Sequence, residues 1–361
     1  MKRIIKNWLY GIQNRDIPSY VTLFVNNICQ LRCDMCFYWD AMQEKTEQLS
    51  LEEIDKLSKS LPNLLQLSLT GGEPTLRKDL DKLVTIFCKN SNVAKCSIST
   101  NGMLTDRITK QVTKFVGDNP NTNFRISISI DGDEQLHDKI RGIKGSYSNA
   151  KNTMFELKKI KYDNLHLDVT TTICKYNYST FFEYIKDIEK DFNPNLYMVN
   201  YTRGITKEKD ANEVPNEAYS NILEYVKSRK RKDNNLLHLA IKTMDRTVLE
   251  EINRIVRDNE FKHYCTAGKK FITIYQDGNV APCEILETMN KLDNSYLGKL
   301  QNFDFDVSKL LKTYYANQLK KWIKDSKCFC TFECARTNDV IFNPSYLGIN
   351  IKNLIKELVY V

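Results

Sequence analysis

The fold of this chain of 361 residues is indicated by one segment, Cys29-Gln30-Leu31-Arg32-Cys33-Asp34-Met35-Cys36. It follows an apolar, β-branched run at residues 20–25, so three thiols are predicted to lie directly after the first strand. In α/β barrels the active-site loops stand at this end of the strands. Three thiolates are one fewer than a structural zinc site uses, whereas a [4Fe–4S] cluster on three cysteines leaves one iron open to another ligand. The spacing predicts such a cluster, with a zinc-bearing or reduced loop as the alternative.

The number of cysteines is itself informative. Eleven are present, and because a reducing compartment rarely keeps structural disulfides, metal binding or catalysis is favoured. The N-terminus begins basic, but Lys6 and Asn7 interrupt any apolar core of a signal peptide. No run reaches the roughly 18 apolar residues of a membrane span. We therefore expect a cytoplasmic protein without a membrane partner.

Composition and charge exclude several other classes of protein. With 42% hydrophobic and 27% charged residues, the chain matches a globular protein better than a disordered, collagenous or coiled-coil one. The net charge of +8 arises from 53 basic residues interspersed with 45 acidic ones. The densest basic run, residues 227–232, is more simply a solvated helix end than a phosphate-binding patch. No nucleic-acid partner is expected.

Strand-like and helical patterns alternate after the first strand. Ser50-Leu51-Glu52-Glu53 opens the first helix as a capping box. The alternation predicts an α/β fold with parallel strands and right-handed crossovers, either a doubly wound sheet or a full or partial barrel. The predicted strands are residues 20–25, 65–70, 93–99, 124–130, 165–172 and 196–201, and further helices are predicted at 79–88, 108–116, 148–160 and 180–191.

Polar motifs stand at the ends of the next three predicted strands. Glycines in such motifs let the backbone approach a ligand closely, and a carboxylate accepts hydrogen bonds from an ammonium group. A turn is the simplest explanation of each motif alone, but four successive strand ends with polar or thiol groups favour one shared ligand site. The motifs are Thr70-Gly71-Gly72-Glu73-Pro74, Ser99-Thr100-Asn101-Gly102, and Ser129-Ile130-Asp131-Gly132 followed by Arg141-Gly142.

Together these segments resemble the radical S-adenosylmethionine (SAM) superfamily, whose C-x3-C-x2-C loop follows the first strand. Met35 replaces the usual aromatic residue, which is a conservative change. The resemblance spans about residues 18–202 and implies a partial (β/α)6 TIM-like barrel with a [4Fe–4S] cluster on Cys29, Cys33 and Cys36. It also implies that Glu73 binds the SAM ammonium. The implied SAM-binding residues are Gly71, Gly72, Glu73, Thr100, Asn101, Ser129, Asp131 and Arg141.

A second group of cysteines lies in the C-terminal third of the chain. Asp277-Gly278 between apolar runs predicts a hairpin that brings Cys265 and Cys283 together. The pattern resembles the SPASM/twitch extension of radical SAM enzymes, in which auxiliary [4Fe–4S] clusters are held. Five thiols suffice for one such cluster, and a four-cysteine zinc ribbon is the alternative. The implied ligands are Cys265, Cys283 and Cys334, with Cys328 or Cys330 as the fourth.

Two residues are predicted to face the reaction cavity. Arg203 follows the sixth strand and is expected to bind an anionic group, with an ion pair as the alternative. Cys88, Cys96 and Cys174 are expected to be small buried hydrophobes, but Cys174 lies just beyond the fifth strand and is the one that could face the cavity. The predicted segments are an N-terminal segment (1–17), a radical SAM core (18–203), a helical connector (204–260), a SPASM/twitch-like cluster domain (261–340) and a C-terminal helix or tail (341–361).

The resemblance implies reductive cleavage of SAM to a 5′-deoxyadenosyl radical that abstracts hydrogen from substrate, with a flavodoxin or ferredoxin as reductant. The leading hypothesis is a small-molecule substrate, such as a saccharide or alcohol-bearing intermediate, because only about twenty residues precede the first strand. The second is modification of a ribosomally made peptide by thioether formation, epimerisation or crosslinking. The third is a non-catalytic iron–sulfur or zinc scaffold, which leaves the open iron beside residues 71–73 unexplained.

Overall fold

Nine strands form one sheet in the computed structural model, which describes residues 2–44, 46–228, 236–287 and 294–359. Six of them run parallel in chain order, each paired with the next. This sequential order excludes the doubly wound alternative, in which the strand order reverses at a switch point. All six lie where the sequence predicts strands. They are β1 (Tyr20–Phe24), β2 (Gln66–Thr70), β3 (Lys95–Thr100), β4 (Asn123–Ser129), β5 (Leu165–Ile173) and β6 (Leu196–Tyr201).

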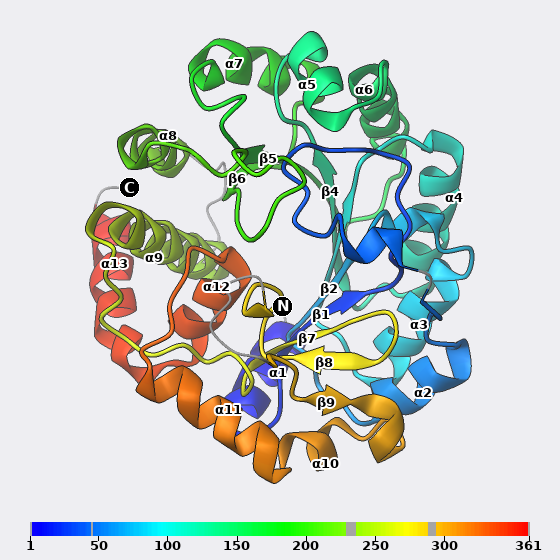
Figure 1. The fold of residues 1–361 in the computed structure, drawn as a ribbon, viewed down its shortest axis with the longest axis vertical. Helices are drawn as coiled ribbons and strands as arrows, with labels where there is room; N and C mark the ends of the chain where they lie inside the picture. Colours follow the sequence, from blue (N-terminus) through cyan, green and yellow to red (C-terminus); the bar gives the residue numbers. More distant parts are fainter. Residues whose placement is uncertain (1, 45, 229–235, 288–293, 360–361) are drawn as a thin grey trace.

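Helices follow these strands and cover one face of the sheet (Figure 1). Ser50 caps its helix as predicted, since its hydroxyl accepts from the Glu53 N–H and the Glu53 carboxylate accepts from the Ser50 N–H. These helices are α2 (Leu51–Lys59), α3 (Leu80–Asn90), α4 (Thr105–Asp118), α5 (Glu134–Arg141), α6 (Ser146–Leu157) and α7 (Phe181–Phe192). Short 3-10 helices lie at Ala41–Gln43, Pro74–Leu76, Leu300–Phe303 and Pro344–Tyr346.

The two faces of the strands differ in chemistry. On β4, Phe124 and Ile126 are buried in the hydrophobic core beneath the helices. The alternating residues face the other side, which we call the lumen. There, Arg125 Nε lies 2.7 Å from Asp168 Oδ2, and the Ser127 hydroxyl shares a 2.5 Å hydrogen bond with a threonine of β5. The lumen is therefore lined by polar groups.

The C-terminal third extends the same sheet. β7 (Phe271–Ile274) pairs in parallel with β1, and β8 (Asn279–Ala281) and β9 (Gly298–Lys299) follow as antiparallel strands. The predicted hairpin is present, with Gly278 at φ +89° in the turn between β7 and β8. The two predicted cluster-bearing segments are thus joined by main-chain hydrogen bonds.

The remaining helices surround this extension. α9 packs against α8, α12 and α13, and Figure 1 shows these four helices on the side of the sheet away from α2 and α3. The Tyr201 N–H, at the end of β6, donates to Glu333 at the start of α12 (3.2 Å), and the Tyr20 hydroxyl on β1 donates to Cys334 Sγ (3.1 Å). α12 therefore bridges β1 and β6. The helices are α1 (Lys2–Gln13), α8 (Asn216–Ser228), α9 (Leu236–Asp258), α10 (Val307–Leu311), α11 (Tyr314–Asp325), α12 (Glu333–Phe342) and α13 (Leu347–Val359).

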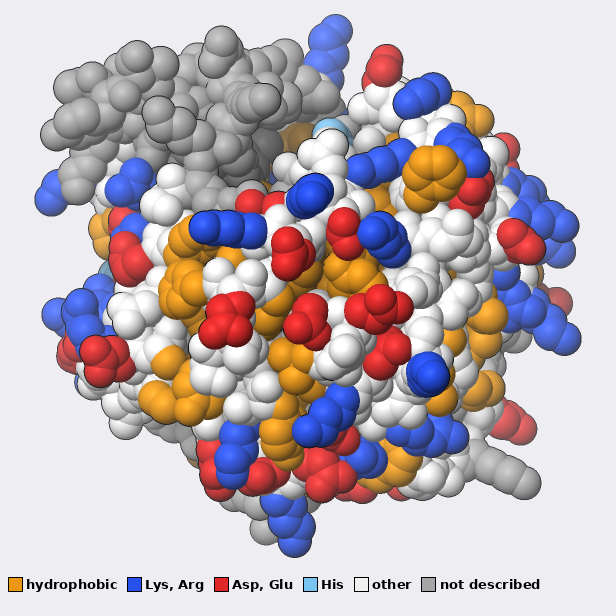
Figure 2. Space-filling view, turned by 90° about the horizontal axis from the view of Figure 1, so that it is seen from above, with side chains coloured by type: hydrophobic (Ala, Val, Ile, Leu, Met, Phe, Trp, Pro, Cys, Tyr) orange, Lys and Arg blue, Asp and Glu red, His pale blue; other side chains and the backbone are white. Residues whose placement is uncertain are grey.

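The surface carries both signs of charge. Figure 2 shows acidic and basic side chains interspersed over the face that it presents. Residues 229–232 of the basic run lie outside the described residues. Within the described part of the chain, none of the helices combines the length and the apolar composition needed to traverse a bilayer.

Candidate active site and cluster sites

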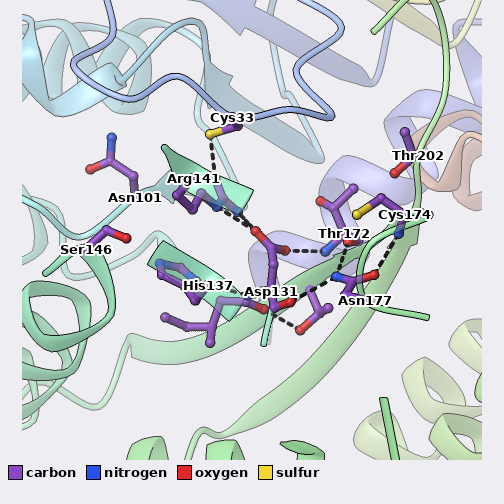
Figure 3. Close-up of polar contacts among 12 residues, drawn as sticks. Cys33, Asn101, Asp131, His137, Arg141, Ser146, Thr172, Cys174, Asn177 and Thr202 are labelled. Atoms are coloured by element: carbon purple, nitrogen blue, oxygen red, sulfur yellow. Dashed lines mark hydrogen bonds and ion pairs between the residues drawn. The ribbon is translucent and has the colours of Figure 1, made fainter. Parts of the chain in front are cut away.

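The three clustered cysteines lie in the loop between β1 and α2, against the ends of β2 and β3. The Cys29 thiol accepts hydrogen bonds from the Leu31 N–H (3.4 Å) and the Asn101 side chain (3.8 Å). The Cys33 thiol accepts one from Arg141 Nη1 (3.6 Å), as Figure 3 shows. The structure thus brings two predicted SAM-binding residues, Asn101 and Arg141, to the cysteine loop.

Burial dominates the ionisation of this loop. It raises the pKa of Cys29 to about 11 and that of Cys36 to about 12, and the neighbouring Cys33 adds to both shifts. It also raises the pKa of Cys33, although Arg141 opposes this. Thiolates here therefore need positive charge beside them, which bound iron supplies. Among the described residues no three His, Cys, Asp or Glu side chains converge on one ion; a loop of three thiols suits a multi-iron cluster, whose irons each take one thiolate.

Gly71 and Gly72 let the cysteine loop lie against the end of β2. The Gly72 N–H donates to Asn26 O (3.1 Å), and the Glu73 N–H donates to Ile28 O (2.7 Å). A Cβ on Gly71, which has φ +142°, would stand 2.3 Å from Asn26 O. A Cβ on Gly72 would stand 2.3 Å from Ile28 O. Only glycine fits either position, so the pair fixes where the three cysteines are held.

The Glu73 carboxylate is engaged within the protein. Its Oε1 accepts hydrogen bonds from the Thr75 N–H (3.1 Å), the Thr75 hydroxyl (2.6 Å) and the Thr100 hydroxyl (2.8 Å). Its Oε2 accepts one from the Asn101 N–H (2.8 Å). Burial raises the pKa of Glu73, and these donors oppose the rise. The carboxylate ties the end of β2 to the end of β3, and its contact with the SAM ammonium stays a prediction.

Replacing Glu73 with alanine is expected to weaken SAM binding and lower the free energy of unfolding by about 2–4 kcal/mol, since several buried donors lose their acceptor. Iron content should not change, because Glu73 is not a metal ligand. Anaerobic denaturation, SAM titration and iron analysis measure the three quantities, with Glu52→Ala at an exposed site as control. Lower stability with unchanged SAM affinity would show that the glycine–glutamate turn is structural only.

Asp131 is the hub of a buried polar network at the end of β4 (Figure 3). Its Oδ2 lies 2.5 Å from both Nε and Nη2 of Arg141, and its Oδ1 accepts from the Thr172 N–H (2.8 Å). The Asp131 N–H donates to His137 Nδ1 (3.1 Å). Burial lowers the pKa of His137 to about 3, so the ring stays neutral. The network joins β4, β5 and α5 and holds Arg141 beside Cys33.

Ser129 and Cys174 are also predicted site residues. Ser129 is the last residue of β4 and is partly buried. Cys174 is fully buried and packs with Met35 and Ile140, next to Cys33. Burial raises the pKa of Cys174 to about 12. The thiol is thus an apolar contact behind the cysteine loop, and its catalytic role stays a prediction.

Arg203 is held between two glutamates. Its Nη2 lies 2.9 Å from Glu284 Oε1, and its Nη1 lies 2.6 Å from Glu333 Oε2. The guanidinium carbon lies 4.3 Å from the centre of the Phe332 ring. This geometry is that of the ion-pair alternative, because both terminal nitrogens already meet carboxylates. Binding of a substrate anion stays a prediction that requires a glutamate to release the guanidinium.

Arg203→Ala is expected to lower the free energy of unfolding by about 3–5 kcal/mol, because it leaves the buried Glu284 carboxylate without its partner. Thermal and denaturant unfolding would measure this loss. Arg257→Ala removes an exposed arginine that pairs with Asp258 and should change stability little. Normal stability combined with lost substrate turnover would support the anion-binding role instead.

The C-terminal cysteines also lie together. Burial raises the pKa of Cys283, and the Cys330 and Cys328 thiols add to the rise. Burial likewise raises the pKa of Cys265, which has Cys330 and Cys283 among its charged neighbours. These four thiols are carried by the loops on either side of the β7–β8 hairpin and by the segment before α12. Four cysteine thiols are a ligand set that a [4Fe–4S] cluster takes.

Cys334 lies apart from this grouping in its contacts. Its thiol accepts the hydrogen bond from the Tyr20 hydroxyl, and its other charged neighbours include Glu284, Arg203 and Glu333. The sequence-based ligand set includes Cys334, and that assignment stays a prediction.

Two residues that sequence reasoning missed complete the sites. Asn26 Nδ2 donates to Glu73 O (2.8 Å) and so braces the cysteine loop. Arg336 lies fully buried near the C-terminal cysteines. In the sequence, only their positions point to these two residues. Asn26 directly follows the first predicted strand, and Arg336 follows Cys334 by two residues.

This chain is similar to known proteins in both sequence and fold. Residues 23–188 match the model of the radical SAM superfamily. The chain is 29% identical to Fe-coproporphyrin III synthase of Methanosarcina barkeri over 46% of its length, but spans only 43% of that relative. It is 26% identical to the cysteine-type anaerobic sulfatase-maturating enzyme of Clostridium novyi, over 92% of this chain and 94% of the relative. The fold is similar to Streptococcus suis SuiB bound to precursor peptide SuiA (TM-score 0.59, 16% identity, 89% of this chain and 69% of SuiB).

The strand order and the family match therefore identify a radical SAM core with an α/β fold. Residues 23–188 are a radical SAM domain, as the motifs predict. Radical SAM domains bind a [4Fe–4S] cluster and SAM, so these two of the three predicted cofactors are confirmed.

Proposed function

We propose that this radical SAM enzyme modifies a peptide or protein substrate. The observation that carries the proposal is the similarity to the sulfatase-maturating enzyme over nearly the full length of both chains, which includes the C-terminal cysteines. The other relative described above matches over less than half of its own length. A substrate class is better inferred from the alignment that includes both halves of this chain.

The site geometry favours a peptide over a phosphorylated small molecule. A phosphate group needs free cationic donors, and arginine is the side chain best suited to hold one. Arg203 is occupied by two glutamates. Beside the Arg125–Asp168 ion pair, the lumen presents neutral hydroxyls such as those of Ser68, Ser97 and Ser127. Neutral donors and acceptors of this kind match the amides of a peptide.

This chain's own residues hold and orient the cofactors. When bound, the cluster and SAM supply one-electron chemistry that abstracts a hydrogen atom from substrate. Cys29, Cys33 and Cys36 would hold the cluster, and the glycine pair after β2 fixes the position of their loop. Asp131 holds Arg141 beside Cys33. α12 bridges β1 and β6 and so links the two ends of the row of parallel strands.

The same proposal includes one auxiliary [4Fe–4S] cluster on the C-terminal cysteines. Cys265 and Cys283 are proposed as ligands on their sequence spacing, and the electrostatic influence of the Cys283 thiol on Cys265 supports the choice. An auxiliary cluster would accept an electron from a substrate radical or bind the substrate directly. A flavodoxin or ferredoxin remains the predicted reductant of the first cluster.

Deuterium transfer tests the substrate class. Reconstituted enzyme, SAM and dithionite are mixed anaerobically with a deuterated extract of the source organism, divided by size into a protein and peptide fraction and a small-molecule fraction. Mass spectrometry then measures deuterium in the released 5′-deoxyadenosine. We expect deuterium from the protein and peptide fraction, and expect protease digestion to single residues to abolish it.

Deuterium that comes only from the small-molecule fraction would overturn the proposal and support a saccharide or alcohol substrate. An enzyme that releases no 5′-deoxyadenosine with either fraction, or that yields zinc in place of iron, would favour the non-catalytic alternative. A Cys33→Ala enzyme provides the background for both fractions.

A further inference from the structure

Arg336, on α12, is a fully buried arginine with few partners of its own. Its Nη2 lies 2.9 Å from Asp339 Oδ2, and its guanidinium carbon lies 4.1 Å from the centre of the Phe261 ring. Its side chain is 0% exposed, and neither Nε nor Nη1 meets a hydrogen-bond acceptor among the described residues. Burying such donors without acceptors is costly, so an acceptor absent from the polypeptide is expected beside them.

Two observations place Arg336 beside the C-terminal cysteines, and the first is that it follows Cys334 by two residues on α12. Asp339 also accepts hydrogen bonds from the N–H (2.7 Å) and hydroxyl (2.8 Å) of Thr266, the residue after Cys265. One carboxylate therefore fixes both the arginine and the loop that carries Cys265.

We propose that Arg336 donates hydrogen bonds to the sulfurs of the auxiliary cluster and raises its reduction potential, with Asp339 as the residue that positions it. This inference rests on the proposed auxiliary cluster. The chain already shows the geometry at its other site, where Asp131 holds Arg141 and Arg141 donates to Cys33 Sγ at 3.6 Å. Each cysteine group thus has a buried arginine–aspartate pair beside it.

The positive charge of Arg336 is the physical reason for the higher reduction potential. Uptake of one electron adds a negative charge to the cluster, and a guanidinium a few ångströms away in a poorly polarisable interior stabilises that charge. Hydrogen bonds to cluster sulfurs act in the same direction, and such outer contacts set potentials together with solvent exposure. The Asp339 carboxylate opposes the effect, so the two side chains have opposite influences on the potential.

A redox titration followed by electron paramagnetic resonance tests the assignment on the anaerobically reconstituted full-length enzyme. At a fixed potential, Arg336→Gln should lower the reduced-to-oxidised ratio of the auxiliary cluster about tenfold, which is 59 mV for a one-electron couple. Arg336→Lys keeps the charge and should shift the ratio less. Asp339→Asn should shift it the opposite way, toward the reduced form. The SAM-binding cluster of each variant should titrate as in the wild type.

Arg77→Lys is the matched control, because Arg77 is a buried, ion-paired arginine whose remaining donors meet backbone carbonyls. It should leave both potentials unchanged. Equal auxiliary potentials in wild type, Arg336→Gln and Asp339→Asn would overturn the assignment, as would shifts of the same sign in both variants. If Arg336→Gln loads no second cluster, the Lys and Asn variants decide by the sign of their shifts. A wild type with about four irons would instead refute the auxiliary cluster itself.

Discussion

Cys33→Ala is expected to abolish release of 5′-deoxyadenosine and to halve the iron content of the enzyme. Anaerobically reconstituted wild type should hold about eight irons, about four for each cluster. Removing one of three thiolates leaves the SAM-binding cluster with two protein ligands, and the Arg141 donor that contacts Cys33 loses its acceptor. Iron analysis and chromatography of the reaction products with SAM and dithionite measure both effects.

The matched control for this change is Cys96→Ala. Cys96 is a fully buried cysteine within the hydrophobic core, on β3. Its replacement should cost some stability through a small cavity but should leave iron content and 5′-deoxyadenosine release as in the wild type. Retention of eight irons in Cys33→Ala would contradict the assignment of the cysteine loop.

Cys283→Ala is expected to separate the two clusters functionally. The variant should lose about half of its iron, because Cys283 is one of the proposed ligands of the auxiliary cluster. It should still release 5′-deoxyadenosine, because its SAM-binding cluster is intact, but should not convert substrate. Iron content, 5′-deoxyadenosine release and the mass of the substrate are the three measurements.

The opposite pattern would be equally clear. Full substrate conversion by Cys283→Ala would show that the C-terminal thiols are not needed for the reaction. Zinc in anaerobically prepared wild type, lost in Cys283→Ala, would identify the C-terminal unit as a zinc ribbon.

Much of the fold follows from the sequence because its strands obey local rules. Residues of the six core strands either alternate between core and lumen or are apolar throughout. Such patterns can be recognised in the sequence without knowing which strands pair. The helix at residues 2–13, α5, and the helices α10, α11 and α12 were not predicted. The first is amphipathic but depends on a distant brace, since the Lys270 ammonium donates to Gly11 O (2.6 Å) and Asn14 O (2.5 Å) near its end.

The candidate site likewise has features that the sequence predicts and features that it does not. The three cysteines and the glycine pair can be predicted from the sequence because the residues of each motif are close together in the chain. The partners of Glu73 and Arg203 are not, since Arg203 meets Glu284 and Glu333 from far along the chain. Sequence shows which charged side chain follows a strand, but only the fold shows whether another chain segment already neutralises it. Arg336 was not predicted because its burial beside the loop of Cys265 depends on contacts between distant segments.

The pairing of β7 with β1 bears on how the protein is made. Tyr20 on β1 faces Phe271 on β7, so this pair is completed only after most of the chain has left the ribosome. Until then β1 is an edge strand with unpaired main-chain groups, and such edges recruit strands from other molecules. A truncation after residue 203 would retain the cysteine loop yet leave this edge permanently open. The last third of the chain therefore acts as a folding partner of the first third. This role is independent of the proposed auxiliary cluster.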